Sequence, residues 1–195
     1  MSGLLPPVPP KKPRVKGGER LKNRDLSLGV VFASLYALLI VALAPISFGP
    51  VQLRVADCLI PLAALLGWPV IAGVTVGCFL GNAYFWLGPY DVIFGPIANL
   101  IAAILIFALR KRQFLACVIG SLPIGLIVGS YLWVFFPPPD IFGLNLPIWS
   151  AMIVSITIST LVAMALLGYA LLKALSRPNI IDPLKSLGLR VYIED

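Results

Sequence analysis

The sequence predicts an all-α membrane protein, a bundle of six transmembrane helices with the N and C termini cytoplasmic. Two observations favour this fold class. The 195 residues are 59% hydrophobic and only 12% charged, which is more apolar surface than one soluble core can hide. Fourteen of the fifteen Lys and Arg residues also fall in three clusters, separated by apolar stretches long enough to cross a bilayer. The exception is Arg54, which therefore needs its own explanation.

The clusters lie at 11–24, 110–112 and 173–190, and six apolar segments alternate with them. These segments are Leu28–Ala44, Val55–Leu66, Val70–Leu87, Asp91–Leu109, Phe114–Phe136 and Pro147–Leu172. The second is only about twelve residues long, against the roughly twenty of a straight span, and Pro61 interrupts it.

One long helix over residues 55–87 would be an alternative, and it would place residues 110–112 outside the cell. Six spans instead put all three cation clusters in the cytoplasm, where loops retain Lys and Arg. We therefore expect the short second segment to cross, or nearly cross, shielded by its neighbours.

This topology divides the chain into three parts. Residues 1–24 carry five prolines and seven cations, which predicts a disordered cytosolic tail. Residues 25–176 form the six-helix transmembrane domain, and residues 177–195 form a cytosolic C-terminal tail. Because the cations flank apolar spans, anionic lipid and topology account for the net charge of +7, and we expect no nucleic-acid partner.

The chain contains no histidine, the commonest general base and metal ligand. Its three cysteines, Cys58, Cys78 and Cys117, are scattered in apolar runs without a CxxC motif, so they read as small buried hydrophobic residues. We therefore expect no enzyme, no catalytic residue, no metal site and no cofactor.

Two predicted helices carry small residues at intervals of four, close to one helical turn. These strips are Gly29, Ala33 and Ala37 in the first helix and Gly73, Gly77 and Gly81 in the third. Such strips let another helix approach closely. The first strip fits either an internal contact or docking onto a separate membrane subunit.

Polar residues gather near the predicted outer ends of the helices. Arg54 and Asp57 are three apart, a spacing at which they can pair across one turn. They are either a capping aspartate with a neighbouring guanidinium, or charges that face a pocket, because charges at membrane depth turn toward a cavity or a partner. Asn82 and Asp91 reach the same outer half of the bundle. They either share a site, or Asn82 makes an interhelical hydrogen bond and Asp91 caps its helix. Asn99 lies about two turns deeper than Asp91.

Three stretches resemble the queuosine-precursor transporter family of QueT type. They are Ile46-Ser-Phe-Gly-Pro50 followed by Arg54 and Asp57, then Gly77-Cys-Phe-Leu-Gly-Asn82, and Asp91-Val-Ile-Phe-Gly95. The family pattern has a longer Glu where this chain has Asp57. Its members are substrate-binding S components of energy-coupling factor transporters.

The resemblance implies a pocket open to the outside that takes up a queuosine precursor or a related deazapurine. It also implies docking on a transmembrane coupling subunit with two ATPase subunits, for which Gly29, Ala33 and Ala37 are the matching positions. An S component for riboflavin or thiamine and a non-transport membrane subunit are the alternatives.

The chemistry of a deazaguanine-like base agrees with the polar residues. Its neighbouring N–H and amino groups suit a carboxylate, and its carbonyl oxygen suits an Arg or Asn donor. An aromatic ring can stack on the base or simply anchor the chain at the membrane interface. The predicted substrate-binding residues are Arg54, Asp57, Asn82, Asp91, Trp86 and Asn99.

Overall fold

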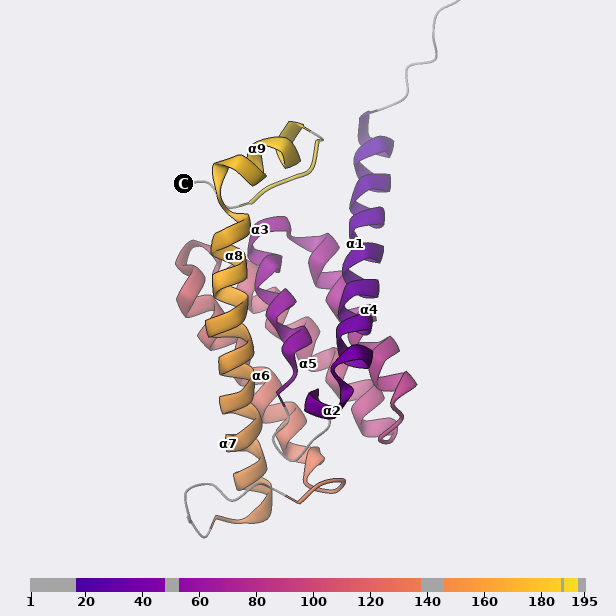
Figure 1. Cartoon of the computed structure of the whole chain (residues 1–195), viewed down its shortest axis with the longest axis vertical. Helices are drawn as coiled ribbons and strands as arrows, with labels where there is room; N and C mark the ends of the chain where they lie inside the picture. Colours follow the sequence, from indigo (N-terminus) through magenta and orange to yellow (C-terminus); the bar gives the residue numbers. More distant parts are fainter. Residues whose placement is uncertain (1–16, 48–52, 138–145, 187, 193–195) are drawn as a thin grey trace, which may run out of the picture.

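The computed structural model describes residues 17–47, 53–137, 146–186 and 188–192, and this part of the chain is helical without a strand (Figure 1). Four of its helices are long and apolar enough to cross a membrane: Asn23–Ala42, Pro89–Ala108, Arg110–Leu132 and Ile148–Leu175. Two shorter apolar helices cover Val55–Leu66 and Trp68–Tyr84. The chain is therefore a multi-pass membrane protein, and the all-α prediction is confirmed.

The elements follow one another with short connections wherever both ends are described. In order they are α1 (Gly17–Ala42), α2 (Ala44–Ser47), η1 (Val55–Leu62), α3 (Ala63–Leu66), α4 (Trp68–Tyr84), α5 (Pro89–Ala108), η2 (Arg110–Arg112), α6 (Gln113–Leu132), α7 (Ile148–Leu161), η3 (Val162–Gly168), α8 (Tyr169–Leu175) and α9 (Pro178–Ser186). Here η1 and η2 are 3-10 helices and η3 is a π-helix.

The short second segment gains length by its winding. Its first eight residues form the 3-10 helix η1, which contains Pro61, and its last four form α3. A 3-10 helix rises about 2.0 Å per residue against 1.5 Å in an α-helix, so the pair extends about 22 Å. This covers most of the roughly 30 Å of a hydrocarbon core.

The alternative of one helix over residues 55–87 is wrong. Helix α3 ends at Leu66, and Gly67 adopts a φ of +68°, a backbone conformation that interrupts the helix. Helix α4 then begins with Trp68 and Pro69, and proline suits the first turn because its missing N–H has no intrahelical partner there.

Glycines bring α1 and α4 into backbone contact. A Cβ atom at Gly73 would lie 2.6 Å from the carbonyl oxygen of Gly29, and one at Gly77 would lie 2.6 Å from that of Ala33. The two small-residue strips therefore face each other. Of the two possibilities for the first strip, internal packing is observed at Gly29 and Ala33.

The two predicted tails take part in helices. Helix α1 begins at Gly17, inside the segment predicted as a disordered tail, while residues 1–16 lie outside the described part. At the other end, Ile181 of α9 is buried, and the backbone N–H of Tyr192 donates to the carbonyl oxygen of Leu65 at 2.9 Å. The C-terminal segment thus packs against the turn between α3 and α4.

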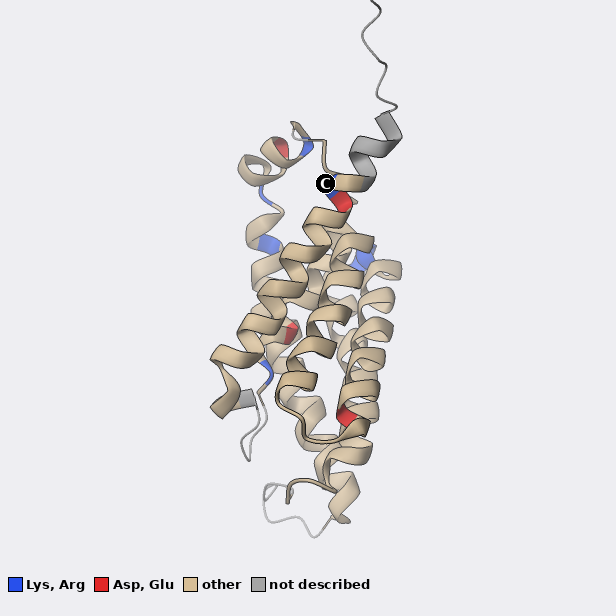
Figure 2. Cartoon of the chain, turned by 90° about the vertical axis from the view of Figure 1, so that its right-hand side faces the viewer, with Lys and Arg blue, Asp and Glu red and all other residues tan. Residues whose placement is uncertain are grey.

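Lys and Arg gather at one end of the bundle, as Figure 2 shows. Lys111 of the second cluster and Lys173 of the third line the same cavity. Arg24 of the first cluster lies beside Gly188, because a Cβ atom there would meet its guanidinium. The described members of the three clusters therefore share one end, as the six-span topology requires.

Candidate functional site

The one cation outside the clusters is buried inside the bundle. Arg54 immediately precedes η1 and is 7% exposed, and Asp57 in the first turn of η1 is fully buried. Of the two alternatives for these residues, the structure does not show the capping aspartate with a paired guanidinium. The helix start has no side-chain cap, and no ion pair joins the two side chains among the described residues.

Arg54 instead reaches across to α4. Its Nη2 donates to Oδ1 of Asn82 at 3.4 Å and to Sγ of Cys78 at 3.1 Å. A cysteine to which the sequence assigned no chemistry therefore contacts the guanidinium. The contacts to α4 hold the cation toward the interior of the bundle.

A tyrosine links Asp57 to Asn99 at the centre of the cluster. The hydroxyl of Tyr36 on α1 donates to Oδ1 of Asp57 and accepts a hydrogen bond from Nδ2 of Asn99 on α5 at 2.7 Å. All three residues are fully buried, so the bonds run between α1, η1 and α5 without water contact. The Nδ2 atom of Asn99 thus has a partner inside the protein, whereas its Oδ1 has none.

Asn82 and Asp91 come together, as expected from their shared outer half. Nδ2 of Asn82 donates to the backbone carbonyl of Asp91 at 2.9 Å, which confirms the interhelical hydrogen bond. Asp91 is not a cap, because Gly88 holds that position and receives no side-chain bond. Its Oδ1 instead accepts from the hydroxyl of Tyr131 on α6 at 2.9 Å.

Sequence reasoning missed Tyr36 and Tyr131. Both are tyrosines within apolar helices, and a phenol hydroxyl at membrane depth needs a hydrogen-bond partner. That requirement was a usable signal. Trp86, which was included, is 65% exposed and makes no described contact with the polar cluster, so its part in a site stays a prediction.

Three buried oxygen atoms in the cluster have no hydrogen-bond partner: Oδ2 of Asp57, Oδ2 of Asp91 and Oδ1 of Asn99. Buried polar atoms are normally satisfied, and each unsatisfied one costs about 1–3 kcal/mol. The three atoms are all acceptors. The arrangement therefore suits a ligand that brings several N–H donors into the cluster.

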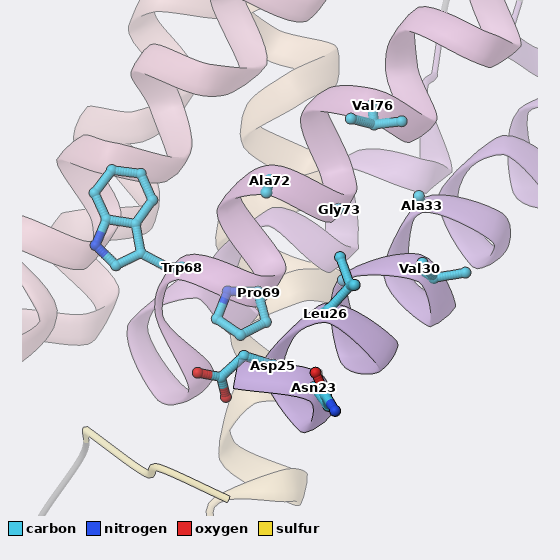
Figure 3. A pocket seen from close by; sticks show the side chains of 11 residues that line it. Asn23, Asp25, Leu26, Val30, Ala33, Trp68, Pro69, Ala72, Gly73 and Val76 are labelled. Atoms are coloured by element: carbon cyan, nitrogen blue, oxygen red, sulfur yellow. The ribbon is translucent and has the colours of Figure 1, made fainter. Parts of the chain in front are cut away.

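The cavities found along the described residues lie away from this cluster. One of about 430 Å³ opens between α1 and α4 and is lined by Gly29, Ala33 and mainly apolar side chains (Figure 3). Another of about 440 Å³ lies beside η2 and α8. Neither of these two cavities is lined by Arg54, Asp57, Asn82, Asp91 or Asn99, which are all buried.

Metal binding finds no support in the described residues. They contain no group of three or more His, Cys, Asp or Glu side chains placed to hold a metal ion. Asp57 and Asp91 also take their hydrogen bonds from different tyrosines, each on its own helix. The two carboxylates are thus arranged as separate acceptors.

Known proteins show similarity over most of the membrane domain. A family model described as QueT transporter matches residues 26–177. The "Queuosine precursor transporter QueT" of Lactococcus lactis subsp. cremoris (strain MG1363) is 30% identical over 103 residues. That match covers 49% of this chain, and the chain spans only 59% of the relative's length. No solved structure matches.

Proposed function

This chain belongs to the QueT transporter family, and from that premise we propose that it is the substrate-binding S component of an energy-coupling factor transporter. Its substrate is a queuosine precursor or a related deazapurine. The relative's name and the match over residues 26–177 support transport rather than enzymatic chemistry.

The observation that carries the proposal is the set of unpartnered acceptors around a buried guanidinium. A deazaguanine base presents an N–H and an amino group side by side, which one carboxylate can accept together. Oδ2 of Asp57 is free for this role. Arg54 or Asn82 donates to the base carbonyl, and Oδ2 of Asp91 receives an aminomethyl cation where the ligand carries one.

Entry from the outside follows from the proposed topology. With six spans and cytoplasmic termini, the end of the bundle remote from the cation clusters faces outward, and Arg54 and Asp91 lie toward that end. In this proposal the substrate reaches the buried side chains of the cluster from that end. Trp86 then turns inward to stack on the base, for about 1–3 kcal/mol by analogy with nucleic-acid binders.

Energy for transport comes from partner subunits in this proposal. The 195 residues contain no glycine-rich phosphate loop ending in Lys and Ser or Thr, so ATP is hydrolysed elsewhere. The cavity between α1 and α4 is apolar, and the exposed residues Val30, Trp68 and Val76 contribute to it (Figure 3). We place the coupling subunit on this face, where Gly29 and Ala33 of the predicted docking strip line the cavity as well as packing against α4, whereas Ala37 does not line it.

A ligand-binding experiment tests the proposal. The purified protein in detergent is heated with deazaguanine, riboflavin or thiamine, and its unfolding temperature is followed. Deazaguanine alone is expected to raise this temperature, and Asp57→Asn is expected to remove the shift. Stabilisation by riboflavin or thiamine alone would assign a different substrate, and no response to any of the three would contradict a role as an S component for these ligands.

A further inference from the structure

A second set of charged residues lies at the other end of the bundle, where η2 and the start of α6 face α8. The cavity of about 440 Å³ at this place is lined by Lys111 and Arg112 of η2 and by Lys173 of α8. Gln113, Phe114 and Tyr169 complete most of its wall. The polar cluster around Arg54 does not take part in it.

This cavity is positively charged and its charges are not neutralised. Its lining contains three cations and no Asp or Glu. Among the described residues, Lys111 and Arg112 form no ion pair, and both side chains are exposed. Arg110, from the same run, is held elsewhere, because its Nη1 donates to the carbonyl oxygen of Phe107 at 3.0 Å and its guanidinium lies 4.7 Å from that ring's centre.

Helix α6 contacts its neighbours differently at its two ends. Gly125 and Gly129 bring α6 into backbone contact with α7 toward the far end of the pair. Near the cations, α6 and α8 instead meet through side chains, because the rings of Phe114 and Tyr169 make an edge contact at 5.4 Å. The Nζ atom of Lys173 lies 5.9 Å from the Tyr169 ring, so the cation stays beside the cavity.

Apolar side chains continue from the cavity along the outer surface of the bundle. Leu115 and Leu122 are seven residues apart on one face of α6 and are exposed. Leu166 of η3 is 64% exposed, three residues before Tyr169. Cations at the end of membrane helices above exposed leucines match the two parts of a phospholipid, a charged headgroup and its acyl chains.

We propose that this cavity binds the headgroup of an anionic phospholipid of the phosphatidylglycerol type. Lys111, Arg112 and Lys173 surround the phosphate, and the fork of the Arg112 guanidinium suits two of its oxygens. Oε1 of Gln113, which is buried and has no partner, accepts from a headgroup hydroxyl. The acyl chains lie against the exposed leucines of α6 and η3. The site is independent of the proposed substrate.

Lipid-dependent unfolding tests this site. The purified full-length protein is mixed with phosphatidylglycerol or with phosphatidylcholine in detergent, and the concentration of each lipid that stabilises it is measured. Phosphatidylglycerol is expected to act at much lower concentration. Each cation removed is expected to raise the phosphatidylglycerol concentration needed for stabilisation about fivefold. The combined variant Lys111→Gln, Arg112→Gln, Lys173→Gln is expected to raise it about a hundredfold.

Arg110→Gln is the matched control, because it removes a neighbouring cation that does not line the cavity. It is expected to leave the lipid response unchanged. Equal stabilisation by the two lipids, an unchanged response of the combined variant, or an equal loss in Arg110→Gln would each overturn the proposal. Inorganic phosphate replacing the lipid at the same concentration would show a free-anion site and overturn the lipid assignment.

The combined variant must also be shown to be folded. The rise in its unfolding temperature on adding deazaguanine is compared with that of Arg110→Gln. If the protein binds no such base, the unfolding temperatures of the two variants in phosphatidylcholine are compared instead. A match to the control ties the lost lipid response to the cavity, whereas a general loss of stability in phosphatidylcholine would contradict a role confined to the headgroup.

Discussion

Buried polar side chains behave differently in the two halves of the molecule. From α1 to α5 they bond to residues far away in the sequence, as Arg54 does to Asn82 and Asn99 to Tyr36. From α6 to α8 several Ser and Thr hydroxyls instead donate within their own helix, as the buried Thr160 does to the carbonyl oxygen of Ile156. A hydroxyl that donates to its own helix offers a ligand only its acceptor lone pairs, so we assign the proposed site to the first half and its support to the second.

One bond joins the halves at the cluster, from the hydroxyl of Tyr131 on α6 to Asp91 on α5. Helix α6 contacts α7 through Gly125 and Gly129. Variants in matched pairs, one from each half, therefore test whether ligand binding and packing are separated in this way.

The largest effect is expected at Asp57. Asp57→Asn keeps the shape of the side chain and removes its charge, so one paired set of acceptors for the base is lost. We expect ligand affinity to fall at least about a hundredfold, as for a buried charged hydrogen bond. Titration calorimetry measures this loss, and Thr157→Val is its partner in the second half, with unchanged affinity. Equal losses in both variants would refute the separation of the halves.

Glycine substitutions separate stability from binding. A Cβ atom at Gly77 would lie 2.6 Å from the Ala33 carbonyl and 2.7 Å from Cβ of Tyr36, and one at Gly129 would lie 2.6 Å from Cα of Ile153. Each change to Ala is expected to lower the free energy of unfolding by about 1–3 kcal/mol. Only Gly77→Ala is expected to lower ligand affinity as well, because it displaces Tyr36. Thermal unfolding and calorimetry together check this, and an affinity loss in Gly129→Ala would contradict it.

Tyr36→Phe removes the donor to Asp57 and the acceptor for Asn99 while keeping the ring. Since two buried groups lose a partner, ligand affinity is expected to fall about tenfold. Tyr84→Phe serves as control because Tyr84 is exposed. The two affinities are compared by calorimetry, and a Tyr36→Phe protein that binds as tightly as the control would remove Tyr36 from the site.

The smallest effect is expected at the link between the halves. Tyr131→Phe leaves Oδ1 of Asp91 without its donor. Because Tyr131 itself is only partly buried, we expect about a fivefold loss of affinity. Tyr90→Phe is the exposed control on α5. A loss as large as that of Asp57→Asn would show that α6 belongs to the site as fully as the first half does.

The sequence predicted the membrane-helix class and most members of the polar cluster because both depend on residue type and spacing along single helices. Arg54, Asp57, Asn82, Asp91 and Asn99 are the expected residues, and all are buried. Apart from the interhelical hydrogen bond of Asn82, their partners were not foreseen, because these depend on how each helix is rotated against its neighbours. The glycines of α4 set that rotation by admitting α1, and only the folded chain shows the result.

The winding of η1 also escaped the sequence reading. Pro61 interrupts the hydrogen-bond ladder of this short apolar segment, which was predicted to cross, or nearly cross, the bilayer only with shielding by its neighbours. The physical consequence is a 3-10 helix, which reaches further with the same residues. Length alone could not reveal this gain.

The 3-10 helix η1 is more extended per residue than the α-helices around it. Its hydrogen bonds have poorer geometry than those of an α-helix, and rewinding its eight residues as α-helix would shorten it by about 4 Å. Such a retraction would draw Asp57 along the bundle axis away from Tyr36, while the long helices keep their places. Amide hydrogen exchange should therefore be faster in η1 than in α4 or α5. A spectroscopic distance measurement from the start of η1 would detect the shortening.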